Sequence, residues 1–146
     1  MPPDKKNTTL VLDQGTSSTK IFLFNLSNHV VFKSEDKHTL KYPRPGHVEA
    51  DALAIAHICE KLIRQAINFA RGKNIHIFVA GIALQRSTFL FWDRKTLKPL
   101  TPALSWQDGR AIDIVKKLKD RSETIFKITG SPLNSHLGGP KFAHLT

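Results

Sequence analysis

The sequence predicts an α/β layer fold built on a mixed sheet, and three observations support this prediction. Three strand-like segments come first, separated by turns that are too short for a crossover connection. An amphipathic helix follows them, and after the helix comes a continuous apolar run rich in β-branched residues. This β-β-β-α-β order is expected of an α/β fold rather than of a sandwich or a helical bundle.

The first part of the chain supplies the three strands. Strand-like patterns cover residues 8–12, 21–26 and 30–38. We expect antiparallel hairpins among them, because residues 25–28 are polar and fit a tight turn. The segment 41–51, KYPRPGHVEAD, is expected to be a loop, since Pro43 and Pro45 each bias the preceding residue away from helix.

The helix and a buried strand come next. From Asp51 onward apolar residues recur at three- and four-residue steps, which is the stripe of an amphipathic helix. Asp51 can cap the start of this helix and Gly72 its end. Residues 75–84, IHIFVAGIAL, form an uninterrupted apolar run, which predicts a strand buried on both faces.

Shorter elements are predicted beyond this strand. Residues 88–92 are expected to be a second buried piece, which turns at DRKTLKP, residues 93–99, toward residues 103–106. A helix is expected to open at Asp108. A helical piece over residues 123–128 is expected to stop at Gly130, and a last helix starts in GGPKFAHLT. Because little chain follows the buried strand to cover both of its faces, the predicted domain is incomplete.

Charge and composition argue against several classes of protein. The formal charge is +10, from 22 lysines and arginines against 12 acidic residues, and such an excess can attract nucleic acid. The basic residues are scattered and do not alternate with aromatic ones, so we do not expect nucleic-acid binding. The first ten residues lack the apolar core of a signal peptide, and no apolar run approaches the roughly 18 residues of a membrane span. The sequence therefore predicts a cytoplasmic protein without membrane insertion, and it leaves a homo-oligomer open.

The stretch DQGTSSTK, residues 13–20, connects the first two predicted strands. Asp13 at the end of a strand is well placed to hold Mg²⁺ through water, because this ion prefers carboxylate oxygens and keeps several waters. Other positions could surround a phosphate with backbone N–H groups, hydroxyls and one positive charge. They are Gly15, Thr16, Ser17, Ser18 and Lys20. The stretch is not a P-loop, which needs a second glycine before the lysine, and by local pattern alone it also fits a polar hairpin turn.

A second polar cluster follows the apolar run, in LQRST. Polar groups at the carboxyl end of a strand in an open α/β sheet commonly face the ligand crevice, which makes Gln85, Arg86 and Ser87 candidate ligand residues. An arginine directly after so apolar a run is costly unless it is paired or solvated. Pairing of Arg86 with a carboxylate is therefore the structural alternative.

Trp106, in ALSWQDGRA, is a candidate sugar-binding residue. Its side chain offers a flat apolar face and an N–H group, the combination that sugars and polyols favour. Most tryptophans belong to a core, which is the alternative here. No His/Cys cluster has the spacing of a metal site, and Cys59, the only thiol, lies on the apolar side of the predicted helix. No GxSxG elbow occurs, so a hydrolase has no support.

Together and in this order, these stretches resemble the FGGY carbohydrate kinase family, most closely its glycerol-kinase-like members. LVLDQGTSSTKIFLFN looks like the family's opening phosphate hairpin, and PRPGHVEAD is similar to its loop before the first helix. GIALQRSTFLFWDRKTLKPLTPALSWQDGRA looks like its substrate-strand block, and TGSPLNSHLGGPK resembles the stretch before its next helix. The resemblance implies the ribonuclease-H-like fold that the family shares with actin and hexokinase.

The resemblance also implies an activity, which is transfer of a phosphoryl group from Mg²⁺-ATP to a hydroxyl of a sugar or polyol. It places Asp13 near Mg²⁺ and the loop from Gly15 to Ser18 at the phosphates. Lys20 stands where glycerol kinases usually have arginine, which keeps the charge but loses the bidentate fork.

On the substrate side, the resemblance points to Arg86 and Trp106. Glycerol kinases carry a glutamate where this chain has Ser87 and a tyrosine where it has His136, and both family residues bind glycerol hydroxyls. These two departures leave open whether the acceptor is glycerol or another polyol or sugar.

The resemblance covers only the first part of the family's first domain, which corresponds to residues 1–146 here. The aspartate that serves the family as general base, and its second, adenine-binding actin-like domain, lie further along such chains. Because phosphoryl transfer depends on groups from both sides of a closed cleft, the resemblance implies that this 146-residue chain is catalytically inactive by itself. A non-catalytic module that binds phosphate or sugar is the alternative.

Overall fold

The computed structural model describes residues 6–146, which form two compact units. Unit 1 combines the described residues up to Thr39 with Leu53–Gln85, and unit 2 combines Leu40–Ala52 with Arg86–Thr146. The prediction that the first ten residues form no signal peptide falls partly on residues 1–5, which lie outside the described residues. In the part of the chain that the structure describes, no helix is long and apolar enough to cross a membrane.

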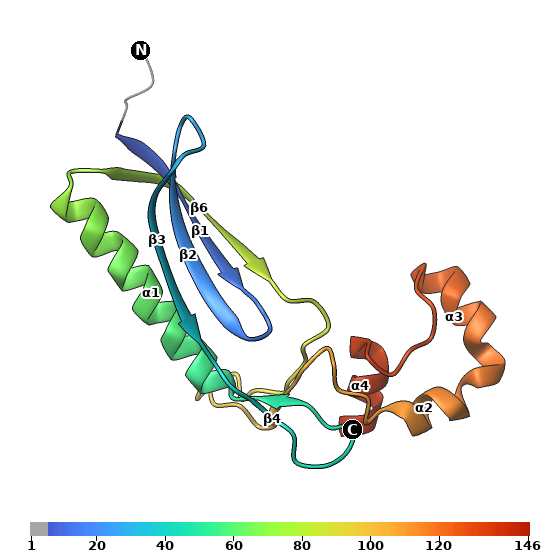
Figure 1. Cartoon of the computed structure of the whole chain (residues 1–146). Helices are drawn as coiled ribbons and strands as arrows, with labels where there is room; N and C mark the ends of the chain where they lie inside the picture. The colour runs from blue at the N-terminus through green and yellow to red at the C-terminus, as the bar shows by residue number, and fades with distance from the viewer. Residues whose placement is uncertain (1–5) are drawn as a thin grey trace. The chain divides into compact units, whose positions relative to one another are not determined.

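Unit 1 contains a four-stranded mixed sheet. Its strands are β1 (Asn7–Gln14), β2 (Ser18–Asn25), β3 (Val30–Lys37) and β6 (His76–Leu84). They lie in the order β3-β2-β1-β6 (Figure 1). The first three strands pair antiparallel as successive hairpins, whereas β6 pairs parallel to β1 after the chain returns through a helix. The predicted mixed sheet is therefore present, and its hairpin strands extend slightly beyond the predicted bounds.

Helix α1 (Ala52–Gly72) packs on one face of this sheet and closes the core of unit 1. Alternate residues of β1 and β2 are buried, as expected of strands with one covered face. The buried apolar core consists of Leu10, Leu12, Ile21, Leu23, Leu62, Ala66 and Ala70. The rings of Phe32 and Phe69 also meet there, with centroids 4.8 Å apart. The helix predicted from the three- and four-residue spacing is confirmed.

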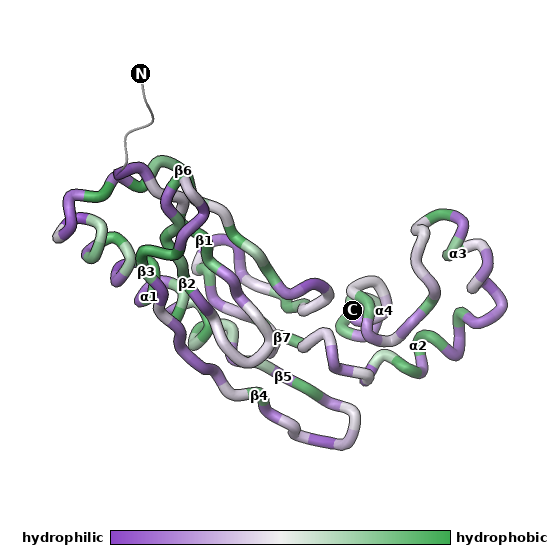
Figure 2. The backbone as a smooth tube through the Cα atoms, turned by 45° about the horizontal axis from the view of Figure 1, so that its top comes forward, coloured by the Kyte–Doolittle hydropathy of each residue, from purple (hydrophilic) through white to green (hydrophobic). Residues whose placement is uncertain are grey.

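Strand β6 is exposed, so the prediction that it is buried on both faces is wrong. Phe78 is 70% exposed and Ile82 and Leu84 are each 66% exposed, and Figure 2 shows the hydrophobic colouring of this segment. The reason is its place in the sheet, since within residues 6–146 β6 has a paired strand only on its β1 side. A continuous apolar run predicts a strand, but it does not show which other elements pack on the two faces of that strand.

Unit 2 contains a small antiparallel sheet. Its strands are β4 (Leu40–Lys41), β5 (Glu49–Ala50) and β7 (Ala103–Leu104), in the order β4-β5-β7. The predicted loop over residues 41–51 is thus partly wrong, because both of its ends form strand pairs. The two prolines at positions 43 and 45 lie between β4 and β5, where they remove no N–H group from the pairs.

The segment 88–92 does not form a continuous strand. It makes only two single bridges, from Phe89 to Leu104 and from Trp92 to Pro99. Between them the chain turns at Asp93, whose carboxylate accepts hydrogen bonds from the N–H groups of Lys95 and Thr96 at 2.9 and 2.6 Å. The turn therefore lies between Trp92 and Pro99, where DRKTLKP predicts it. The piece 88–92 is bridged rather than paired as a continuous strand, and Trp92 at its end is 64% exposed instead of buried.

The remaining elements of unit 2 are helical. They are α2 (Ile112–Lys117), the 3₁₀ turn η1 (Lys119–Arg121), α3 (Ser122–Thr129) and α4 (Gly138–Leu145). The helix predicted from Asp108 begins later, because the Asp108 side chain bonds to the backbone of Val48 and does not cap α2. Gly130 ends α3 with a φ of 68°, in the left-handed conformation that glycine adopts at little cost.

Candidate functional site

The predicted phosphate stretch forms a tight hairpin in unit 1. Residues 15–17 connect β1 to β2, and the Gly15 N–H group donates a hydrogen bond of 3.0 Å to the Ser18 carbonyl oxygen. Asp13 and Lys20 are direct cross-strand partners. Both alternate with residues buried under α1, so they project from the opposite face of the sheet. The structure therefore brings a carboxylate, a lysine and a hydroxyl-bearing loop to one end of the hairpin.

The hairpin loop leaves little room for a side chain at position 15. A Cβ atom there would lie 3.1 Å from the Ser18 carbonyl oxygen, closer than ordinary van der Waals contact. The Gly15 carbonyl oxygen in turn accepts hydrogen bonds from Nε2 of Gln14 at 2.7 Å and from Nε2 of His38 at 3.2 Å. A side chain at position 15 would therefore require the Ser18 carbonyl group to shift by a few tenths of an ångström.

We expect Gly15→Ala to lower the free energy of unfolding by about 1–3 kcal/mol, because the added methyl group must displace backbone that is already hydrogen-bonded. Gly72→Ala is the matched control, since a Cβ atom at Gly72 meets nothing within 4 Å. Urea denaturation of both variants measures the difference. Equal stability of the two variants would contradict the close approach at Gly15.

His38 fixes the hairpin loop from the end of β3. Its backbone N–H group donates to the Ser17 carbonyl oxygen at 3.1 Å, and its Nε2 atom lies against the Gly15 carbonyl. Because a carbonyl oxygen only accepts, the Nε2 atom must carry the proton. Sequence analysis missed His38, since nothing in its local pattern shows that β3 ends beside residues 15–17.

Gln85 lies beside the same hairpin. Its N–H group donates to the Gln14 carbonyl oxygen at 3.0 Å, and its side-chain Nε2 lies 3.3 Å from Oε1 of Gln14. Gln85 thus continues the pairing of β6 with β1 and belongs to unit 1, whereas Arg86 and Ser87 belong to unit 2. The Arg86 side chain is exposed, which removes the desolvation cost expected after an apolar run.

Unit 2 gathers three of the predicted substrate residues. The backbone N–H group of Trp106 donates to Oγ1 of Thr88 at 3.3 Å, which places Trp106 next to the segment that begins at Ser87. Nδ1 of His136 lies 3.1 Å from the Trp106 carbonyl oxygen and therefore carries a proton. The Trp106 side chain is 43% exposed, so it is not a core residue and can offer its face to a ligand.

A buried charge network stands behind this part of unit 2. The Asp108 carboxylate accepts from the Val48 N–H group at 2.6 Å and from the Arg110 guanidinium at 2.8 to 3.0 Å. Arg110 also bonds Glu49 at 2.7 Å. Burial alone would raise the pKa of Asp108, but the hydrogen bonds from Arg110 and Val48 hold it below its ordinary value. Asp108 is therefore ionised and structural at neutral pH.

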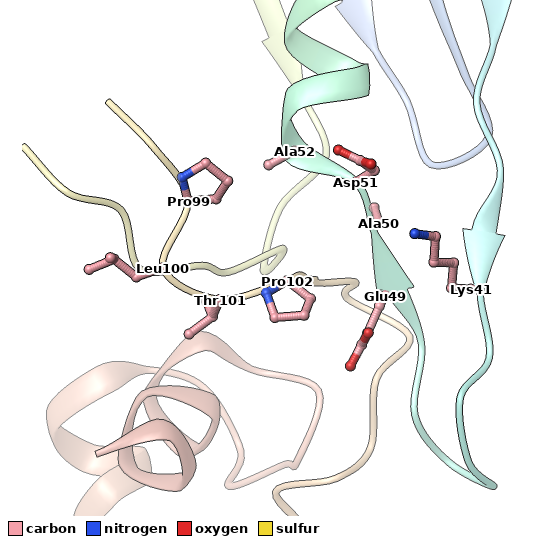
Figure 3. Close-up of a pocket in the computed structure, with 9 residues that line it drawn as sticks. All are labelled: Lys41, Glu49, Ala50, Asp51, Ala52, Pro99, Leu100, Thr101 and Pro102. Atoms are coloured by element: carbon pink, nitrogen blue, oxygen red, sulfur yellow. The ribbon is translucent and has the colours of Figure 1, made fainter. Parts of the chain in front are cut away.

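A pocket in unit 2 and the Cys59 thiol lie outside these groups of residues. An open pocket of about 370 Å³ in unit 2 is lined by Lys41, residues 49–52 and residues 99–102, and Figure 3 shows that none of the predicted ligand residues lines it. Burial raises the pKa of the Cys59 thiol, which disfavours the thiolate needed of a nucleophile. Among residues 6–146 no cluster of three or more His, Cys, Asp or Glu side chains could hold a metal ion.

Comparison with known proteins agrees with these motifs. A model of the N-terminal domain of the FGGY family of carbohydrate kinases matches residues 8–145. A glycerol kinase of Methylobacterium radiotolerans is 38% identical over 92% of this chain and 27% of its own length. A glycerol kinase of Variovorax paradoxus is 36% identical over 93% of this chain and 28% of its own length. The chain therefore spans little more than a quarter of the relatives that it matches.

Solved structures share the fold of the chain. The crystal structure of Plasmodium falciparum glycerol kinase with ADP is 30% identical, with a TM-score of 0.89 over 96% of this chain and 28% of that one. The structure of a ligand-bound xylulose kinase from Lactobacillus acidophilus is 22% identical, with a TM-score of 0.82 over 95% of this chain and 28% of that one. At this identity the likeness shows the fold alone. The predicted fold class is thus supported as a mixed α/β fold of the actin and hexokinase type. Since the family model covers almost every residue from the first strand to the last helix, the chain belongs to the FGGY family of carbohydrate kinases.

Proposed function

We propose that residues 1–146 form the N-terminal part of the first domain of an ATP-dependent kinase that acts on a sugar or polyol. The observation that carries this proposal is the hairpin of unit 1, in which Asp13 and Lys20 are cross-strand partners beside a loop that leaves little room for a Cβ atom at Gly15. Relatives named glycerol kinase, 36% and 38% identical over this same region, support it.

The residues of the hairpin fit Mg²⁺-ATP. A loop without a side chain at Gly15 lets backbone approach phosphate oxygens closely, and Thr16, Ser17 and Ser18 add hydroxyl donors. Asp13 would hold Mg²⁺ through water, and Lys20 would add a positive charge opposite it. Bound Mg²⁺-ATP would supply the phosphoryl group, with the metal ion offsetting its negative charge.

The acceptor would be bound in unit 2 by Arg86, Ser87, Trp106 and His136. Gln85, which directly precedes Arg86 in the sequence, bonds Gln14 beside the hairpin. The exposed Trp106 face suits the C–H side of a polyol, and Ser87 and His136 offer groups that bond hydroxyls. Ser87 is shorter than the glutamate of glycerol kinases, which favours an acceptor larger than glycerol.

By itself the chain is expected to bind without transferring phosphate, because phosphoryl transfer depends on groups from both sides of a closed cleft. A cytoplasmic location stays a prediction of the sequence. The alternative is a non-catalytic module that binds phosphate or sugar through the same two groups of residues. Under this alternative the chain binds the same ligands, but no kinase activity appears when the remaining parts of such a kinase are supplied.

Calorimetry of the chain with Mg²⁺-ATP tests the proposal. We expect Mg²⁺-dependent binding that Asp13→Ala weakens by about tenfold, because the charge-assisted contact to the hydrated ion is lost. Asp113→Ala is the control, since this carboxylate is exposed on α2 in unit 2. Unchanged affinity in Asp13→Ala, or no binding of Mg²⁺-ATP by the unaltered chain, would overturn the hairpin assignment.

A further inference from the structure

A buried lysine that sequence analysis missed lies behind the candidate substrate residues. Lys141 is on α4, and its side chain is fully buried. Its ammonium group donates hydrogen bonds to the Ser87 carbonyl oxygen at 2.9 Å and to the Ser105 carbonyl oxygen at 2.5 Å. Within residues 6–146 no carboxylate lies at ion-pair distance from this ammonium group. A buried charge with only carbonyl partners is costly to the fold.

The two carbonyl groups belong to the two segments that carry the candidate substrate residues. The Ser87 carbonyl follows Arg86, and the Ser105 carbonyl belongs to the peptide unit that leads into Trp106. These segments also meet at the Phe89–Leu104 bridge, with backbone hydrogen bonds of 2.9 and 2.7 Å. Lys141 therefore bonds both segments next to that bridge, at Ser87 before Phe89 and at Ser105 after Leu104. These positions adjoin the candidate substrate residues.

Ser87 has a backbone conformation that needs such support. Its φ is 61°, in the left-handed region that serine rarely adopts. Residues held in this region persist where the surroundings determine them, and here the Lys141 ammonium group bonds the Ser87 carbonyl directly. The Ser87 carbonyl group in this conformation is thus bonded by a residue of α4, 54 residues away in the sequence.

We propose that Lys141 is a positioning residue, which holds the backbone of Ser87 and Trp106 in the arrangement that binds a polyol hydroxyl group. This inference rests on the proposed function for the identity of the ligand. Lys141 would not touch the ligand, because its side chain is fully buried and its ammonium group bonds the Ser87 and Ser105 carbonyl oxygens. The buried charge of Lys141, which has no carboxylate partner, lowers the stability of the fold. Its hydrogen bonds fix the geometry of the two neighbouring segments.

The charge state of Lys141 makes this role sensitive to pH. Burial lowers the pKa of Lys141 to about 8, with the Asp108 carboxylate opposing this shift and the Arg110 guanidinium adding to it. The unfolded chain keeps the proton up to an ordinary pKa of 10.5. Folding therefore becomes more favourable as pH rises from about 8, whereas the bonds to the carbonyls weaken, because a neutral amine is a poorer donor than ammonium.

The experiment compares Lys141→Met with the unaltered chain. Calorimetry with glycerol and with xylitol measures the ligand affinity, thermal unfolding measures the stability, and amide hydrogen exchange of Phe89 and Leu104 measures the bridge. We expect about tenfold weaker polyol binding and about tenfold faster exchange at the bridge, together with an equal or higher Tm. Ser105 keeps one partner in the variant, because its carbonyl oxygen also accepts from the Asp108 N–H group at 2.9 Å.

Opposite changes in stability and affinity separate positioning from a merely structural role, which would lower both. Lys141→Gln keeps an N–H donor without charge, and its affinity should not change between pH 7 and 9, whereas that of the unaltered chain should fall several-fold. Lys116→Met, at an exposed position on α2, is the control. Unchanged exchange at Phe89 and Leu104, or a fall in Tm together with affinity, would overturn the positioning role. Absence of polyol binding by the unaltered chain would instead overturn the proposed substrate site, with the exchange data still deciding the role of Lys141.

Discussion

Replacing Asp108 with alanine is expected to lower the free energy of unfolding by about 3–5 kcal/mol, because it breaks a buried ion pair and leaves its partner behind. The Asp108 side chain is fully buried, and it bonds both the Arg110 guanidinium and the Val48 N–H group. In the variant, Arg110 would keep only Glu49, at a position where its side chain is 10% exposed. Tryptophan fluorescence during urea denaturation measures the loss, since both tryptophans, Trp92 and Trp106, belong to unit 2.

The control for this variant is Asp113→Ala, which removes an exposed carboxylate paired with Lys116 and should change stability by less than about 1 kcal/mol. The pH dependence gives a second check. The pKa of Asp108 is held below its ordinary value of 3.8, so its contribution is complete above that pH and is lost as the pH falls through the native value. The stability difference between the chain and Asp108→Ala should therefore shrink only in strong acid. A difference that vanishes already at pH 5 would contradict the buried pair.

The elements of unit 1 could be predicted because their signals are local. The stripe of α1 and the alternation in β1 and β2 each appear within one segment of sequence, and the predicted helix and hairpins are present. The burial of β6 could not be predicted, because the composition of a strand does not show which layers cover it. The segment 88–92 is only partly as predicted, because it makes single bridges and Trp92 is exposed. The turn predicted at residues 93–99 is present and is stabilised by the carboxylate of Asp93.

In the candidate site, too, the residues with local sequence signals could be predicted and those without them could not. DQGTSSTK and the stretch around Trp106 carry recognisable residues in a recognisable order, so their chemistry could be proposed from sequence. The side chains that hold them could not, because His38 bonds Gly15 across 23 residues, Lys141 bonds Ser105 across 36, and Asp108 bonds Val48 across 60. Such contacts leave no local pattern. A motif search finds groups that could touch a ligand and overlooks those that fix their geometry.

The second large effect is expected in the core of unit 1, where Leu62→Ala should lower the free energy of unfolding by about 3–5 kcal/mol. Leu62 is 1% exposed on α1 and packs in the cluster formed with β1 and β2, so truncation leaves a cavity under the sheet that carries the hairpin of residues 13–20. Leu53→Ala, on the same helix but 48% exposed, is the matched control and should cost about 1 kcal/mol or less. Far-UV circular dichroism during urea denaturation measures both variants. If the two substitutions cost the same, the face that α1 presents to the sheet is wrong, and so is the argument that Asp13 and Lys20 project from the opposite face.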